Sequence, residues 1–164
     1  MSGARTWALI AALGPTVILG AALFSQYVGG LHPCTMCIWQ RWPHGVAIAL
    51  ATLSLLIGPH LTAIWALRAG ALALLIGAGI GGFHVGVEQG WWEGPSTCTG
   101  GDISQLSPEA LISQIMNAPL VRCDEIAWAF LGISMAGWNA ILSILMAVIT
   151  WKAAAVYASS SASQ

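Results

Sequence analysis

Residues 61–83 read LTAIWALRAGALALLIGAGIGGF, an apolar run of the length that crosses a bilayer. A helix needs about 20 residues to span the ~30 Å hydrocarbon layer. The glycines at positions 70, 77, 79, 81 and 82 favour close packing against neighbouring helices. We therefore predict a transmembrane helix over 61–83 that packs inside a bundle.

Three further apolar runs flank this one, and they predict spans at about 7–28, 39–57 and 126–151. The first is longer than the roughly 7–15-residue core of a signal peptide, so we expect it to be retained. Gly58-Pro59 breaks the chain between the second and third spans and leaves a very short loop. The sequence thus predicts an all-α membrane protein, a bundle of four transmembrane helices.

Composition agrees with this fold class. Hydrophobic residues make up 57% of the 164 residues and charged residues only 7%, whereas a soluble domain carries about 25% charged residues. The length predicts one domain, over residues 1–152. The net charge of −1 argues against nucleic acid as a partner.

The loops at 29–38 and 84–125 follow the first and third predicted spans, so an odd number of crossings precedes each. Both loops then lie on the same face of the membrane. All six acidic residues fall between positions 88 and 125, which marks the second loop as the main water-exposed part. The four cysteines, all in or next to these loops, can therefore meet.

Basic residues decide the orientation by a narrow margin. Arg5, Arg68 and Lys152 lie towards one face, and Arg41 and Arg122 accompany the cysteines. The positive-inside rule then puts both termini, with a disordered tail over 153–164, in the cytoplasm. The cysteine loops face the oxidising compartment, where disulfides persist.

A short helix is expected within the second loop. Ser107-Pro108-Glu109 has the N-cap, first-position proline and early acid of a helix start. Leu111, Ile112, Ile115 and Met116 follow at helical spacing. Such an amphipathic helix either packs on the protein or lies in the membrane interface.

Cys34-Thr35-Met36-Cys37 indicates redox chemistry. The loop of a CxxC is so short that closing it gains little entropy, but exchange between neighbouring sulfurs is fast. The alternative is half of a zinc site, which needs four ligands. The other cysteines, Cys98 and Cys123, are 25 positions apart and form no second CxxC, so we expect no metal.

Arg41 lies four residues after Cys37, at the membrane boundary beside Trp39 and Trp42. It is either an interfacial arginine that reaches to water or a functional group. Next to a CxxC we favour the second, because a guanidinium can hydrogen-bond a quinone carbonyl and stabilise charge on the reduced ring.

Cys98 and Cys123 allow two interpretations: a plain disulfide that closes the loop, or an outer redox pair that a thiol protein attacks. Cys123 adjoins Arg122, a cation that favours its departure as a thiolate. His84 and Glu88, at i and i+4, are either an interfacial hydrogen-bonded pair or part of a quinone pocket.

Two motifs together resemble the DsbB family of bacterial disulfide bond formation proteins. The first is Pro33-Cys34-Thr35-Met36-Cys37-Ile38-Trp39-Gln40-Arg41, and the second is Cys123-Asp124-Glu125-Ile126-Ala127-Trp128-Ala129-Phe130-Leu131-Gly132. His84 and Cys98 lie between them, and Met135 and Trp138 continue the second motif. The resemblance covers nearly the whole chain.

The resemblance implies a multi-pass protein of the bacterial inner membrane with two periplasmic loops. Cys34 and Cys37 would then exchange electrons with ubiquinone or menaquinone, and Arg41 and His84 would bind that quinone with Cys37. Cys98–Cys123 would be offered to a DsbA-like periplasmic thioredoxin-fold oxidase, with Cys98 forming the mixed disulfide. A departure is Gln40, where some members have glutamate.

Two other functions compete with this one. A structural membrane protein with a stabilised outer loop has no need of the CxxC and Arg41 together. An enzyme like vitamin K epoxide reductase uses similar chemistry, but there the CxxC comes late and the loop pair early, the reverse of the order here.

Overall fold

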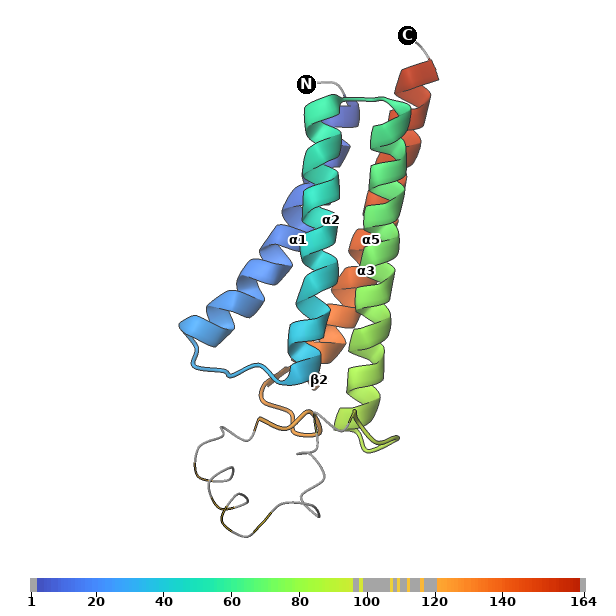
Figure 1. Cartoon of the computed structure of the whole chain (residues 1–164). Coiled ribbons are helices and arrows are strands. Elements are labelled where there is room, and N and C mark those ends of the chain that lie inside the picture. Colours follow the sequence, from blue (N-terminus) through green and yellow to red (C-terminus); the bar gives the residue numbers. More distant parts are fainter. Residues whose placement is uncertain are drawn as a thin grey trace.

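The computed structural model describes residues 3–95, 98, 107, 109, 112, 116 and 121–162. This part of the chain forms an elongated bundle of four long helices (Figure 1). They are α1 (Gly3–Tyr27), α2 (Thr35–Ile57), α3 (Leu61–Glu88) and α5 (Met135–Ala162). Two short strands, β1 (Ala129–Phe130) and β2 (Ile133–Ser134), precede α5.

Helix α3 packs against α2 and α5, and α1 packs against the same two helices. Both ends of the chain and the Gly58 turn lie at one end of the bundle, which we call the terminal end (Figure 1). The opposite end carries Cys34 at the start of α2, and we call it the sulfur end. Helix α1 leans away from its neighbours towards the sulfur end, as Figure 1 shows.

Small residues let the helices approach closely, as the glycines of 61–83 predict. A Cβ at Gly81 would lie 3.1 Å from the Ala136 carbonyl oxygen on α5. Gly70 and Gly77 face α2 in the same way, with Ala47 and Pro43 as their neighbours. Positions 79 and 82 face open space, so only part of the glycine pattern serves helix packing.

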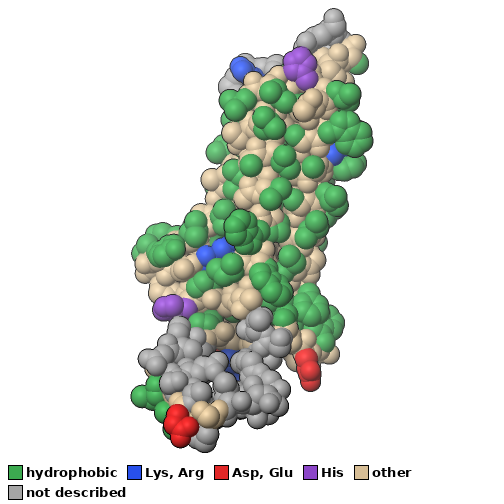
Figure 2. Space-filling view, in the orientation of Figure 1, with side chains coloured by type: hydrophobic (Ala, Val, Ile, Leu, Met, Phe, Trp, Pro, Cys, Tyr) green, Lys and Arg blue, Asp and Glu red, His purple; other side chains and the backbone are tan. Residues whose placement is uncertain are grey.

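The outside of the bundle is largely apolar, and Figure 2 shows hydrophobic side chains along the length of the face that it presents. Among the described residues, α1, α3 and α5 are long and apolar enough to cross a membrane. Helix α2 falls outside this set, since its first turns carry Gln40, Arg41 and His44. The chain thus has the character of a helical membrane protein, and three of the four predicted spans correspond to helices that could cross a membrane.

The fourth span was predicted to start at Ile126, which is wrong, because α5 begins at Met135. The preceding residues form an antiparallel hairpin in which Phe130 pairs with Ile133. Leu131 and Gly132 both have positive φ, 53° and 77°, as a type I′ turn requires. Ser134 then caps α5 by accepting a hydrogen bond from the Gly137 amide at 3.2 Å.

The predicted disordered tail is also wrong as far as the chain is described, because α5 continues to Ala162. Ala153, Ala154 and Tyr157 are buried in a cluster with residues of α1 and α3. The Tyr157 hydroxyl donates to the Ser54 carbonyl at 3.3 Å. This tertiary packing orders a segment whose local composition suggests disorder.

Two other boundaries move towards the sulfur end. Helix α2 begins at Thr35, before the predicted Trp39, because Cys34 caps it. Helix α3 continues past Phe83 to Glu88, so the loop begins at 89, five residues later than the predicted 84. Most of the helix expected from Ser107 to Met116 lies outside the described residues and stays a prediction.

Candidate redox site

The CxxC occupies the first turn of α2. Cys34 is the N-cap residue, and its Sγ accepts a hydrogen bond from the Cys37 amide at 3.2 Å. The two sulfurs are 2.7 Å apart, and both cysteines are free. A hydrogen bond from the Cys37 thiol lowers the pKa of Cys34 to about 4, against the opposing effect of burial. Cys34 is therefore the thiolate of the pair at neutral pH, the form in which a cysteine is nucleophilic.

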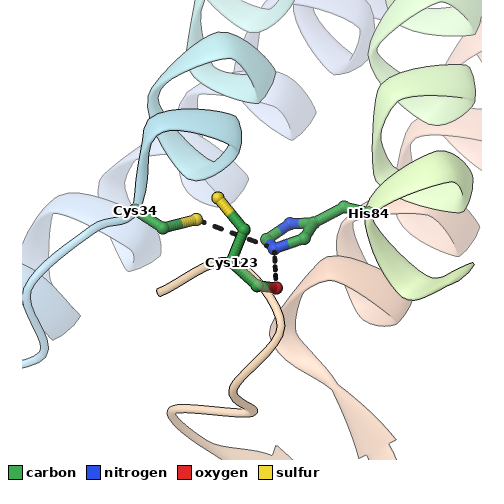
Figure 3. Close-up of side chains that lie close together, drawn as sticks. All are labelled: Cys34, His84 and Cys123. Atoms are coloured by element: carbon green, nitrogen blue, oxygen red, sulfur yellow. Dashed lines mark hydrogen bonds between the residues drawn. The ribbon is translucent and has the colours of Figure 1, made fainter. Parts of the chain in front are cut away.

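Cys98 and Cys123 form a disulfide with Cα atoms 5.2 Å apart. Both are buried, and they share one cluster with Cys34 and Met36, against which Cys37 packs. The expectation that the four cysteines can meet is thus met by the geometry. Figure 3 shows Cys123 lying beside Cys34, with His84 approaching both from α3.

His84 links the two pairs. Its Nε2 is 3.1 Å from the Cys123 carbonyl oxygen and 3.6 Å from Cys34 Sγ (Figure 3). Its Nδ1 is 2.9 Å from the Gln40 side-chain amide. The imidazole is only 3% exposed, so the site holds it in one orientation.

Glu88 lies one turn after His84, with Oε1 4.0 Å from Nε2. Its other oxygen accepts a hydrogen bond from Ser134 Oγ at 2.5 Å. His84 and Glu88 are thus neighbours but beyond hydrogen-bond distance, and Ser134 ties Glu88 to the start of α5.

Arg41 lies one turn beyond Cys37 and is half-buried. Its Nη1 donates to Gln26 Oε1, at the end of α1, over 2.5 Å. Gln26 thus ties the guanidinium of α2 to the end of α1.

A cavity of about 500 Å³ joins these groups, a volume typical of small-molecule sites. Its polar lining includes Cys37, Gln40, Arg41 and His84. Its apolar walls come from α1, α5 and the hairpin, with the aromatic side chains Trp128, Phe130 and Trp138. A flat, mostly apolar ligand with carbonyl groups fits this combination of an aromatic wall, a cation and a thiol.

A metal ion is the alternative ligand to consider. Cys34, His84 and Cys123 have potential ligand atoms within 4.8 Å of one another. The Cys123 sulfur is bonded to Cys98, however, so two of the three remain available in this oxidation state. Zinc sites use three or four protein ligands, and the described residues fit a thiol–disulfide site better.

Arg122 does not act as a free cation beside Cys123. Its guanidinium bonds Asp124 at 2.5 Å and lies 3.6 Å from Glu125. The bond to Asp124 raises the pKa of Arg122 but compensates its charge. The sequence-based argument that Arg122 helps Cys123 to leave is weakened accordingly.

Sequence reasoning missed three partners of the site: Gln26, Ser134 and Asn139. It noted Gln40 only as a departure from a family pattern. All four are polar side chains within or next to apolar helices. Because polar groups are costly there, such positions are the available sequence signal for function.

Comparison with known proteins places these features in a family. The family model described as "Disulfide bond formation protein DsbB" matches residues 4–153. Proteins named "Disulfide bond formation protein B" from Paracidovorax citrulli and Methylococcus capsulatus are each 34% identical to the chain. The first match covers 88% of this chain and 83% of the relative, and the second covers 84% and 86%.

A protein of the same name from Saccharophagus degradans is 32% identical, over 90% of this chain and 92% of the relative. No solved structure matches the chain.

Proposed function

Because the chain belongs to the DsbB family, and is thus an oxidoreductase of disulfide bond formation, we propose that it is a membrane thiol:quinone oxidoreductase. It reoxidises a DsbA-like periplasmic dithiol oxidase and passes the electrons to ubiquinone or menaquinone. The observation that carries the proposal is the contact between the two cysteine pairs, with Cys34 and Cys123 in one buried cluster beside the cavity.

The first steps take place at the outer pair. A thiolate of the partner attacks Cys98, forms a mixed disulfide with it and expels Cys123 as a thiolate. The partner's second thiolate then attacks its own mixed disulfide and releases Cys98. The partner leaves oxidised, and Cys98 and Cys123 hold its two electrons as a dithiol.

The electrons then pass inward by a second exchange. The Cys123 thiolate attacks Cys34 of an oxidised inner pair and expels Cys37. Cys98 attacks Cys123, which restores the outer disulfide and frees Cys34. The outcome is an outer disulfide and an inner dithiol.

The residues around the cavity suit a quinone. Arg41 would hold a ring carbonyl, His84 would face the inner sulfurs, and Cys37 lines the same space. When bound, a quinone accepts two electrons and two protons from the inner dithiol and becomes a quinol.

We propose that all four long helices cross the membrane, α2 included. Its 23 residues extend about 35 Å at 1.5 Å per residue, and it runs beside α3 for its whole length (Figure 1). Residues 1–152, with the rest of α5 to Ala162 packed against them, then form a single domain of the bacterial inner membrane with both termini cytoplasmic. The sulfur end faces the periplasm.

The test of the function is electron transfer by the purified chain. We expect it to oxidise a reduced thioredoxin-fold protein only when quinone is present, with one quinone reduced per disulfide formed. Absorbance of the quinone and free-thiol titration follow the two sides of the reaction. Thiol oxidation without quinone reduction would overturn the proposal. The absence of both would indicate a structural membrane protein instead.

The order of transfer has its own test. In Cys123→Ser, Cys98 is a free thiol. Its thiolate attacks the disulfide of the oxidised partner and expels one partner cysteine as a thiolate, so a mixed disulfide between Cys98 and the partner should be visible on non-reducing gels. Cys98→Ser is the matched control and should give no such complex. A complex formed only by Cys98→Ser would reverse the roles of the two cysteines.

A further inference from the structure

Three side chains from three helices form a hydrogen-bonded chain that ends at the sulfurs. Asn139 on α5 bonds Gln40 Oε1 on α2 at 2.7 Å. Gln40 Nε2 bonds His84 Nδ1 on α3 at 2.9 Å. Gln40 is only 6% exposed and His84 only 3%, so both side chains are held inside the bundle.

Backbone carbonyls determine which group donates in each of these hydrogen bonds, because a carbonyl oxygen can only accept. Gln40 meets the Met36 carbonyl at 3.2 Å with the same side-chain atom that meets His84. That atom must therefore be the amide nitrogen, which donates. His84 Nδ1 is consequently the acceptor and carries no proton.

The other side of the ring gives the same answer independently. His84 Nε2 lies 3.1 Å from the Cys123 carbonyl oxygen. Since that carbonyl can only accept, Nε2 carries the proton. The Met36 and Cys123 carbonyls, on the two sides of the imidazole, therefore independently indicate the same tautomer of His84.

This tautomer has a consequence for the sulfurs. The Nε2 proton points towards the Cys123 carbonyl and towards Cys34 Sγ, 3.6 Å away. A hydrogen bond from His84 adds to that from Cys37 in lowering the pKa of Cys34. In this state His84 is a donor that holds a thiolate and the Cys123 backbone side by side, and Nε2 cannot take a proton.

We propose that Gln40, anchored by Asn139, is a positioning residue that keeps His84 protonated at Nε2 and thereby aligns Cys123 with Cys34 for exchange. The inference rests on the proposed function only where it states that the alignment serves exchange between Cys123 and Cys34. The tautomer itself is a property of the resting protein. Metal-site histidines are oriented by partners of the ring in the same way.

The first experiment reads the tautomer without any turnover. Protein labelled with ¹⁵N-histidine is examined by long-range ¹H–¹⁵N NMR in detergent, and His84 is assigned by its loss in His84→Phe. We expect a protonated Nε2 and an unprotonated Nδ1. The reverse pattern in the wild-type protein would overturn the inference even if the chain proves to be a thiol:quinone oxidoreductase.

The second experiment removes the donor. Gln40→Leu should abolish the single-tautomer signature and slow the exchange from Cys123 to Cys34 about fivefold in single-turnover quench measurements, the scale of one lost hydrogen bond between neutral groups. The quinone KM should change by less than the exchange rate. Gln89→Leu, at an exposed position just after α3, is the matched control and should change neither.

A third variant keeps the test decisive if Gln40→Leu does not fold. Gln40→Glu has the same shape, but its carboxylate can only accept. His84 must then place a proton on Nδ1, and the ¹⁵N signature must change. An unchanged signature in Gln40→Glu, or an unchanged exchange rate in a folded Gln40→Leu protein, would refute the positioning role.

Discussion

At the terminal end of the bundle, buried hydroxyl groups bond to backbone carbonyls, whereas at the sulfur end buried side chains also bond to one another. Thr150 donates to the Met146 carbonyl, and Ser54 donates to those of Leu50 and Ala63. Around them the buried cluster consists mostly of alanines from all four helices, together with Ile64, Leu67 and Tyr157.

At the sulfur end, Asn139, Gln40 and His84 depend on each other's exact placement. Burial of polar groups costs free energy unless each finds its partner. A bundle that needed only stability would gain little from this arrangement. The contrast indicates that the terminal end holds the helices together and the sulfur end holds the reacting groups in place, so substitutions at the two ends should fail differently.

The largest effect is expected from the inner cysteines. Cys34→Ser or Cys37→Ser should lower quinone reduction by more than a thousandfold while the protein still inserts, because neither variant can form the inner disulfide. Steady-state quinone absorbance with a reduced thioredoxin-fold donor measures the loss.

The double variant Cys98→Ser/Cys123→Ser serves as the control for the inner pair. It should lose oxidation of the protein donor but keep quinone reduction by a small dithiol that reaches Cys34 directly. Normal turnover in either inner-cysteine variant would contradict the assignment.

The next effect is a shift in pH dependence. Because the pKa of Cys34 is lowered to about 4, the thiolate predominates above that pH and its reactivity is lost only as the pH falls through about 4. Alkylation of Cys34 with iodoacetamide, mapped by mass spectrometry across pH, gives the midpoint. Cys37→Ala removes the main hydrogen-bond donor, so the midpoint should rise towards the ordinary thiol value of ~8.5. A wild-type midpoint already near that value would show that Cys37 does not stabilise the thiolate.

Arg41 should affect binding more than folding. Arg41→Lys keeps the charge but loses the planar pair of donors, and we expect the quinone KM to rise by about 10- to 100-fold, the scale of one to two hydrogen bonds to a charged group. Gln26→Leu, which frees the guanidinium from α1, should raise the KM by a smaller factor. Unchanged KM and kcat in Arg41→Lys would leave Arg41 as an interfacial anchor.

The smallest effect tests the terminal end. Tyr157→Phe removes one hydrogen bond to Ser54 and should lower stability by roughly 0.5–1.5 kcal/mol, with quinone reduction unaltered. Thermal unfolding in detergent measures the change. Tyr27→Phe is the matched control, because Tyr27 is 77% exposed. Lost turnover in Tyr157→Phe at a temperature where the protein is folded would contradict the claim that the terminal end affects stability alone.

Several features of this protein follow from the sequence by itself. Long apolar runs and the break at Gly58-Pro59 are local signals, so they placed α1 and the start of α3 within a few residues. The order of spans put both cysteine loops at one end. The CxxC and Arg41 identified the chemistry because their spacing along one helix is itself local.

Other features were decided only by the tertiary structure. Ile126 to Ser134 is apolar enough to continue a helix, but the hairpin and the Ser134 cap start α5 later. The last turns of α5 are ordered by Tyr157 packing against distant helices. The polarity of the site depends on Gln40, whose partners His84 and Asn139 are 44 and 99 positions away in the chain. Hydrogen bonds over such separations form only when the packed helices bring the groups within 3 Å, and no local pattern encodes that distance.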